Sequence, residues 1–168
     1  MPFIQTSLLI TTYNWPAALK LCLHSVLRQT RLPDEILIAD DGSRNDTKLL
    51  IEEFQKISQI PITHIWHDDN GFQLSVIRNK AIAQARFEYI IQIDGDVILE
   101  NHFIEDHMRI CQTDYFVIGS RSNLNESDTK KILAGKQIPD NNFFKTLKRF
   151  NLNSQRNIFI SKFLSDKY

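Results

Sequence analysis

The sequence predicts an α/β protein with a mostly parallel sheet that helices cover on both faces. Two observations support this fold class. Over the first 119 or so residues, short apolar runs alternate with amphipathic helical stretches, and short links join them. The apolar runs are nearly continuous, with no strict alternation of polar and apolar residues, which is typical of parallel strands buried on both faces.

The strands are expected where the apolar runs lie. These runs are rich in β-branched or aromatic residues, and polar or turn-forming residues follow them. We expect strands at residues 7–13, 34–41, 62–67, 89–94 and 115–119.

Helical patterns separate these strands. In the first of them, Leu19, Leu23 and Val26 fall on one face, Asn14 stands in the capping position and Pro16 lies near the first turn. We expect helices at residues 16–30, 46–57, 74–86 and 102–112.

The composition changes at Ser120, where Asn, Lys and Phe become frequent. We therefore predict one domain over residues 1–120 and a second region over residues 121–168. That region should be mainly helical or irregular and incomplete, with a loop followed by two short amphipathic pieces. The loop and the two pieces are expected at residues 135–142, 143–150 and 157–164.

The bulk composition is that of an ordinary globular domain, with 42% hydrophobic and 24% charged residues. No apolar run approaches the ~20 residues of a membrane helix, and the start of the chain reads as a first strand, not as a signal peptide. Cys22 and Cys111 fall in apolar helical patterns, so they are expected to be core thiols. These features predict a cytoplasmic protein.

The net charge of +0 hides an asymmetry along the chain. Residues 1–119 carry 10 Lys and Arg against 16 Asp and Glu, whereas residues 120–168 carry 10 against 4. The acidic part suits a cation site, and the basic part suits phosphates or peripheral contact with the inner face of a membrane. Alternatively, the basic tail packs on the acidic part.

Polar residues follow four of the predicted strands. The carboxyl ends of parallel strands meet at one edge of a sheet, which is where ligands of such folds bind. The polar exits are Tyr13-Asn14, Asp40-Asp41, His67-Asp68-Asp69 and Asp94-Gly95-Asp96. We expect them to converge on one site.

Asp94 and Asp96 are the candidate ligands of a hard cation at that edge. Mg²⁺ or Mn²⁺ takes one or two protein carboxylates and completes its shell with water and phosphate oxygens. The intervening Gly95 is expected to let a ligand approach the backbone. The pair could also be a solvated turn or a calcium loop, although Ile98 and Asn101 break the pattern of that loop. It also resembles the Asp-x-Asp of haloacid-dehalogenase phosphatases, which remains an alternative.

Four stretches in order decide between these alternatives. SLLITTYN, LRQTRLPDEILIADDGSRNDT, NGFQLSVIRNKAIAQA and YIIQIDGDVIL together resemble the family-2 inverting glycosyltransferases, over about residues 5–121. The resemblance implies the nucleotide-diphosphosugar transferase (GT-A) fold, which is Rossmann-like. It also implies a UDP-sugar donor and a polysaccharide, lipopolysaccharide or lipid-linked acceptor. No nucleic acid is expected as a partner.

The resemblance also assigns roles by position. Thr11 and Tyr13 would line the base. Asp41, or alternatively Asp40, would accept the uracil N3–H, and the other acid would fix the loop. The remaining roles concern the diphosphate: Arg78 would hold the diphosphate or the ribose-side acids, Asp94 would meet the ribose or a metal-bound water, and Asp96 would ligate Mn²⁺ or Mg²⁺.

The general base that the family supplies from its second half is not found in this sequence. The acids after Ser120 do not stand in the family's Glu-Asp setting; they are Glu126, Asp128, Asp140 and Asp166. We therefore expect a chain that stops before its acceptor region is complete. A non-catalytic remnant that binds nucleotide-sugar is the alternative to an active enzyme.

The histidines are not expected to share a metal. His64 and His67 are three apart on a predicted strand, so they should face opposite sides. His102 and His107 are five apart on a predicted helix, which is not the spacing that aligns two ligands.

Overall fold

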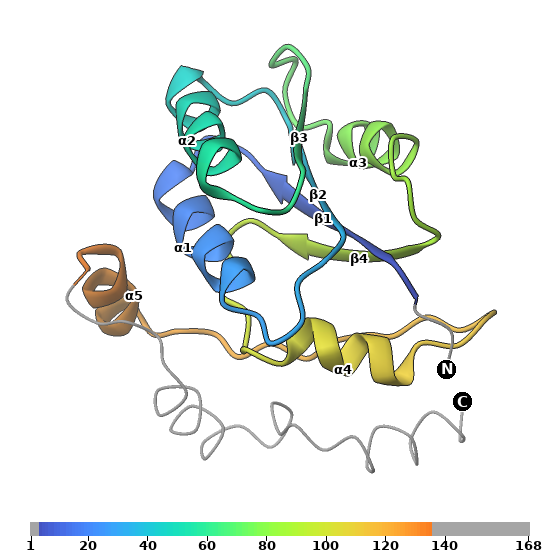
Figure 1. Cartoon of the computed structure of the whole chain (residues 1–168). Helices are drawn as coiled ribbons and strands as arrows, with labels where there is room; N and C mark the ends of the chain where they lie inside the picture. Colours follow the sequence, from blue (N-terminus) through green and yellow to red (C-terminus); the bar gives the residue numbers. More distant parts are fainter. Residues whose placement is uncertain (1–3, 136–168) are drawn as a thin grey trace. The chain divides into compact units, whose positions relative to one another are not determined.

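The computed structural model describes residues 4–135 of the chain. The chain divides into two compact units, Met1–Leu99 and Glu100–Tyr168. The first unit holds the sheet and ends just beyond its last strand (Figure 1). The division therefore precedes the change in composition at Ser120, on which the boundary predicted from the sequence depended.

The first unit is built on a four-stranded parallel sheet. Its strands are β1 (Thr6–Thr12), β2 (Glu35–Asp40), β3 (Ile62–Trp66) and β4 (Tyr89–Asp94), in the order β3-β2-β1-β4. The predicted parallel sheet is confirmed, and each of these strands lies within one residue of its predicted bounds. The chain extends the sheet in one direction up to β3 and then returns to the other side of β1.

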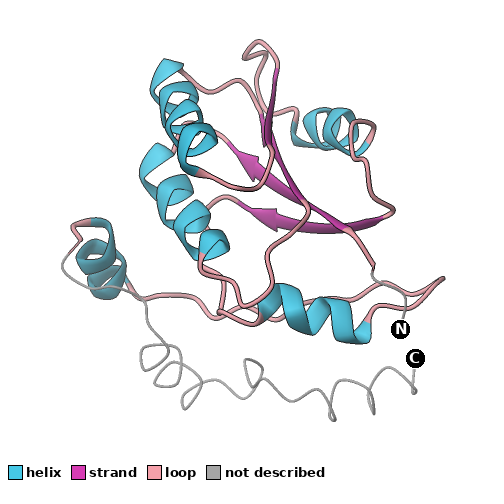
Figure 2. Ribbon diagram, viewed as in Figure 1, coloured by secondary structure: helices cyan, strands magenta, loops and turns pink. Residues whose placement is uncertain are grey.

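Helices cover both faces of this sheet, as predicted. They are α1 (Pro16–Leu27), α2 (Asn45–Ile57) and α3 (Leu74–Ile82). The first two lie on one face and α3 lies on the other (Figures 1 and 2). Right-handed crossovers explain this arrangement. The connections that contain α1 and α2 run across the sheet in one direction, from β1 to β2 to β3. The connection that contains α3 runs in the opposite direction, from β3 to β4, so α3 lies on the other face.

Alternate residues of the central strands fill the two cores. Leu9 and Leu37 are paired in register and pack with Ile77 and Ala81 of α3. Their neighbours Leu8 and Ile10 point to the opposite face and are fully buried. Burial on both faces accounts for the unbroken apolar strands in the sequence.

The start of α1 corrects one prediction. Asn14 does not cap the helix: Trp15 is the N-terminal flanking residue and makes no side-chain capping bond. Asn14 instead adopts a left-handed backbone with φ of 47°. Its side-chain oxygen accepts the Arg44 backbone N–H at 2.9 Å, so it ties the β1 exit to the β2 exit.

The second unit contains α4 (Phe103–Ile110) and α5 (Glu126–Leu133) in its described part. The strand predicted at 115–119 is wrong, because these residues adopt no regular structure. Phe116 and Ile118 are 85% and 81% exposed. A β-branched run without a neighbouring strand to complete its hydrogen bonds does not form a strand.

Helix α5 was not predicted, although its start carries a recognisable signal. Asn125 Oδ1 accepts the Asp128 backbone N–H at 2.9 Å, and Asn125 Nδ2 donates to Asp128 Oδ2 at 2.9 Å. The first of these bonds is the N-cap half of a capping box, and the second joins the two side chains, so it does not complete the motif through the Asn125 backbone N–H. The predicted loop beyond Gly135 and the two amphipathic pieces lie outside the described residues.

The remaining observations concern thiols, histidines and membrane spans. Cys22 is buried, and burial together with the nearby Asp96 charge raises the pKa of its thiol to about 12, as befits a core residue. His102 contacts Glu105 at 3.1 Å, and within residues 4–135 no three His, Cys, Asp or Glu side chains form a group that could hold a metal. None of the helices described is long and apolar enough to cross a membrane.

A buried glutamate joins three segments at the amino end of the sheet. Glu35 is 2% exposed and accepts hydrogen bonds from the Ser7 hydroxyl at 2.6 Å and from the Arg86 backbone and side chain, both at 2.7 Å. Burial alone would raise the pKa of Glu35. The hydrogen bonds from Ser7 and Arg86 and the Arg86 charge outweigh it and lower that pKa.

We expect Glu35→Gln to lower the free energy of unfolding at pH 7 by about 2 kcal/mol, because a buried charged hydrogen bond is lost. The pKa of Glu35 is lower in the folded than in the unfolded chain. Its contribution is therefore complete above the unfolded value of about 4.3 and is lost as the pH falls through the folded value. Urea unfolding between pH 7 and pH 3 measures this difference.

The matched control is Glu52→Gln. Glu52 forms an exposed ion pair with Lys48 at 3.9 Å, and such pairs contribute about 0–1 kcal/mol. Equal losses in the two variants, or a Glu35→Gln loss that does not shrink at low pH, would contradict the role given to Glu35.

Candidate functional site

The candidate site lies at the carboxyl edge of the sheet, where the strand order changes direction. β1 stands between β2 and β4, so the loops after these strands leave on either side of the β1 exit. In open parallel sheets this point is where ligands bind. The polar exits predicted from the sequence therefore do share one edge, and they form two groups of contacts.

The first group centres on the acids that end β2. Asp40 is fully buried. Its Oδ1 accepts the Ser43 backbone N–H at 2.8 Å, and its Oδ2 lies 2.9 Å from His64 Nε2. A carboxylate without such donors would be costly to bury. Asp40 therefore holds the turn after β2 in place and presents little of itself to a ligand.

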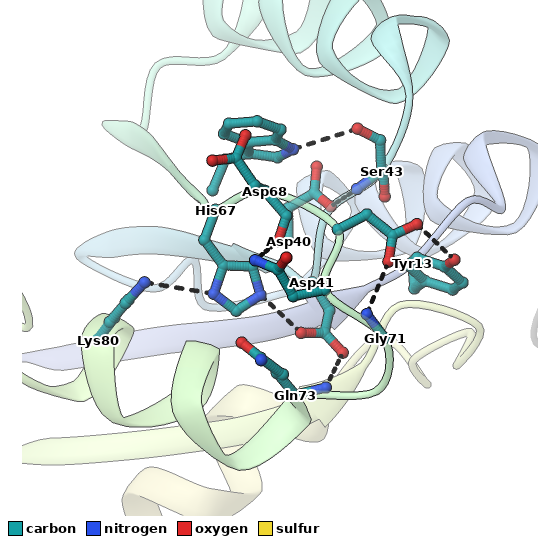
Figure 3. Close-up of polar contacts among 12 residues, drawn as sticks. Tyr13, Asp40, Asp41, Ser43, His67, Asp68, Gly71, Gln73 and Lys80 are labelled. Carbon is teal, nitrogen blue, oxygen red and sulfur yellow. Dashed lines mark hydrogen bonds and ion pairs between the residues drawn. The ribbon is translucent and has the colours of Figure 1, made fainter.

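Asp41 is bound by a different segment (Figure 3). Its Oδ1 lies 2.8 Å from His67 Nε2, and its Oδ2 accepts the Gln73 backbone N–H at 3.0 Å. The Asp41 side chain is 5% exposed. Because each carboxylate oxygen has two lone pairs, both oxygens retain capacity for a further donor.

Close backbone contact brings the loops after β2 and β3 together. A Cβ on Gly42 would lie 2.7 Å from the Asp69 Cα, and Gly42 has a φ of +96°, so only glycine fits. On the far side of this contact, the Tyr13 hydroxyl donates to Asp69 Oδ2 at 3.0 Å. The Tyr13 ring is 52% exposed, which leaves part of it free for a planar ligand.

The second group joins β4, β1 and α3. Asp94 Oδ1 accepts from the Thr11 hydroxyl at 3.0 Å and from an Arg78 terminal nitrogen at 2.9 Å. Arg78 Nε is buried and has no hydrogen-bond partner in residues 4–135. The guanidinium therefore has unused donors, while the Asp94 side chain is still 44% exposed.

Asp96 differs from the other acids at this edge. It is exposed and makes no hydrogen bond or ion pair with the residues described. One open carboxylate beside one partly engaged carboxylate fits the donor set of Mg²⁺ or Mn²⁺, which bind few protein ligands beside water and phosphate. Asp94 and Asp96 would hold such an ion.

Gly95 has a different role from the one predicted. Its backbone N–H donates to the Thr11 carbonyl at 2.7 Å, and a Cβ there would lie 2.8 Å from that oxygen. Gly95 is buried. Its missing side chain therefore lets β1 and the β4 exit approach each other, and it does not open the backbone to a ligand.

Sequence reasoning brought the acids to this edge but missed the side chains that hold them. The sequence analysis rejected His64 and His67 as metal ligands and gave them no other role. In the structure they form hydrogen bonds with the adjacent acids Asp40 and Asp41. A signal was available, because β3 pairs with β2: His64 stands two positions before the partner of Asp40, and His67 follows β3 as Asp41 follows β2. Nothing in the spacing pointed to the Gln73 backbone.

Comparisons with known proteins agree on one family. The model of Glycosyl transferase family 2 matches residues 7–165. A hyaluronan synthase of Pasteurella multocida is 29% identical over 132 residues, which are 77% of this chain and 13% of that protein. A chondroitin synthase of Escherichia coli is 28% identical over 72% of this chain and 18% of that protein. The chain thus spans less than a fifth of either synthase.

Solved structures show the same fold. TarS of S. aureus, residues 1–349 in complex with UDP-GlcNAc, superimposes with a TM-score of 0.53 at 22% identity, over 63% of this chain and 30% of that one. A mannosyltransferase from Pyrobaculum calidifontis, in complex with GDP-Man and Mn²⁺, gives 0.50 at 18% identity over 56% of this chain and 28% of that one. The predicted GT-A fold is confirmed, and the comparisons favour it over the phosphatase alternative.

We expect Gly95→Ala to lower the free energy of unfolding by about 2 kcal/mol, because the new methyl group would press on the Thr11 carbonyl. Urea unfolding measures this loss. Gly119→Ala is the control, since a Cβ there would meet only the Phe103 ring at 3.6 Å. If Gly95→Ala were as stable as Gly119→Ala, the close approach of β1 and the β4 exit would not constrain this position.

Proposed function

This chain belongs to glycosyl transferase family 2, and we propose that it binds a UDP-sugar with a divalent cation and transfers the sugar to a glycan with inversion. The observation that carries this proposal is the pairing of two unlike acidic groups across the β1 exit. Asp41 is enclosed and fixed by hydrogen bonds, whereas Asp96 is open. A nucleotide-diphosphosugar needs both: a fixed acceptor for its base and a cation for its diphosphate.

The base would lie on the side of β2. Asp41 can accept the uracil N3–H through a lone pair that the protein leaves unused. The exposed face of Tyr13 can stack on the uracil ring, while its hydroxyl bond to Asp69 keeps the ring in place. Thr11 and Asp40 act indirectly in this arrangement, because Thr11 orients Asp94 and Asp40 holds the turn after β2.

The diphosphate would lie on the side of β4. Asp96 and Asp94 would hold Mn²⁺ or Mg²⁺, which stabilises the charge that develops on the leaving nucleoside diphosphate. Arg78 keeps Asp94 oriented through its ion pair and offers its remaining donors to the ribose or diphosphate. Support for the donor comes from TarS, whose structures contain UDP and UDP-GlcNAc.

The acceptor is proposed from the relatives, because acceptor selectivity does not follow from the described residues. Relatives named hyaluronan synthase, chondroitin synthase and putative teichuronic acid biosynthesis glycosyltransferase suggest a growing polysaccharide. A lipopolysaccharide or lipid-linked acceptor is implied by the family resemblance alone. Inverting transfer also needs a base that removes the proton of the acceptor hydroxyl. We propose that transfer takes place in the cytoplasm, with peripheral contact at the inner face of the membrane.

We expect UDP with Mn²⁺ to raise the melting temperature, because a ligand at ten times its Kd adds about 1.4 kcal/mol to the free energy of unfolding. Asp96→Ala should abolish the Mn²⁺-dependent part of the rise. Differential scanning fluorimetry with UDP alone, Mn²⁺ alone and both together measures these terms.

Glu88→Ala is the control for a lost carboxylate, since exposed Glu88 precedes β4 at the opposite end of that strand. This variant should respond to UDP and Mn²⁺ as the unmodified chain does. The absence of any shift at millimolar UDP with Mn²⁺ would refute the donor site. Release of UDP from a UDP-sugar, measured in parallel, would distinguish an enzyme from a protein that only binds the donor.

A further inference from the structure

A chain of hydrogen bonds runs from the surface of α3 to Asp41. Lys80 Nζ lies 3.3 Å from His67 Nδ1, and His67 Nε2 lies 2.8 Å from Asp41 Oδ1 (Figure 3). The three residues come from three segments: Lys80 from α3, His67 from just after β3, and Asp41 from just after β2. The His67 side chain is 10% exposed, so the central residue of these hydrogen bonds is shielded from water.

The chemistry of the two ends fixes where the imidazole carries its proton. An ammonium group has hydrogens to donate and no lone pair, so His67 Nδ1 must accept from Lys80. An ionised carboxylate only accepts, so His67 Nε2 must donate to Asp41. Both ends therefore require the same neutral tautomer, with the proton on Nε2.

Asp41 is thereby held at both oxygens before any ligand arrives. Gln73 donates to Oδ2 from the backbone, and His67 donates to Oδ1 from a side chain. Rotation of the carboxylate would break at least one of these bonds. A ligand that needs this carboxylate in one orientation then binds without the cost of ordering it.

The neighbouring pair, His64 and Asp40, shows that the hydrogen bonds from Lys80 through His67 to Asp41 do more than allow an acid to be buried. His64 neutralises the burial cost of Asp40 in the same manner, with an Nε2 to Oδ2 distance of 2.9 Å. Asp40 is 0% exposed, and no residue described sets the tautomer of His64 from its other nitrogen. Of the two histidines, a described lysine contacts only His67, whose acid Asp41 is 4% exposed and not fully buried.

We propose that His67, kept in one tautomer by Lys80, is a positioning residue that orients the Asp41 carboxylate for recognition of the donor's base. This inference rests on the proposed function, in which Asp41 accepts the uracil N3–H. It adds that selectivity for uracil depends on a histidine and a lysine that themselves touch no ligand. Cytosine has no hydrogen on N3, so it cannot make the N3–H bond for which Asp41 is oriented.

Isothermal titration of UDP and CDP with Mn²⁺ on the full chain tests this proposal. The unmodified protein should prefer UDP, and Asp41→Asn should remove the preference. His67→Phe should raise the Kd for UDP about tenfold, which is the loss expected when a charged hydrogen bond is broken. The Kd for CDP should change little. His67→Gln should restore most of the preference, because its amide can donate to Asp41.

His24→Phe is the matched control. His24 packs edge-on against Phe54 between α1 and α2, with ring centroids 5.0 Å apart. It should leave the UDP-to-CDP ratio unchanged. A purely structural role for His67 predicts instead a lower melting temperature in His67→Phe with an unchanged ratio, and that result would overturn the inference while leaving the donor site intact. No UDP binding by the unmodified chain would overturn the proposed function itself.

A second measurement stands even if His67→Phe does not fold. The imidazole ¹⁵N shifts of His67 should report the Nε2–H tautomer in the unmodified chain, and Lys80→Met should introduce the other tautomer or exchange between the two. The same variant should lower the UDP-to-CDP ratio. An Nδ1–H tautomer in the unmodified chain, or an unchanged spectrum and ratio in Lys80→Met, would refute the role of Lys80.

Discussion

The carboxyl edge of this sheet depends on the need to give hydrogen-bond donors to buried carboxylates. Asp40 ends β2, which is covered on both faces, and Asp41 follows it, and both are buried, so neither can rely on water. Three of their four donors come from β3 and the loop after it, and the fourth is the Ser43 backbone N–H in the turn after β2. These bonds fix the turns after β2 and β3. The cost of burying charge thus gives the loops a defined arrangement, which a solvated turn would not have.

β1 carries the second constraint, because it stands between the two acidic groups. Its Thr11 hydroxyl donates to Asp94, and its Thr11 carbonyl accepts from Gly95. One residue therefore sets both the direction of Asp94, the acid that ends β4, and the path of the backbone that leads to Asp96. The reversal of strand order at β1 is what allows this, since it makes β2 and β4 neighbours of the same strand.

The strands and helices that follow from the periodicity of apolar residues could be predicted from the sequence. The side-chain contacts between distant segments could not. Continuous apolar runs predicted β1 to β4 well, because burial on both faces leaves a clear pattern. Apolar residues at helical spacing predicted the helices between them. The run at 115–119 has a similar composition, but no strand in residues 4–135 pairs with it, and propensity alone did not make it a strand. The acids were predicted by type and position. The histidines, Gln73 and Lys80 were not assigned to this site, because contacts between residues 13 to 32 positions apart follow from strand register and loop path.

Four acids at the carboxyl edge of the sheet differ in how far hydrogen bonds and ion pairs compensate their charge, and this difference separates their roles. Asp40 is fully enclosed and bonded at both oxygens, so it can only hold structure. Asp41 is bonded at both oxygens but not sealed, which suits a directional acceptor. Asp94 is paired with Arg78 and would be the weaker of the two as a ligand for a cation, whereas Asp96 is exposed and forms no ion pair with the residues described. In the proposed donor complex, a cation that arrives with the diphosphate would therefore be attracted most strongly to Asp96, although Asp94 and Asp96 are only two residues apart.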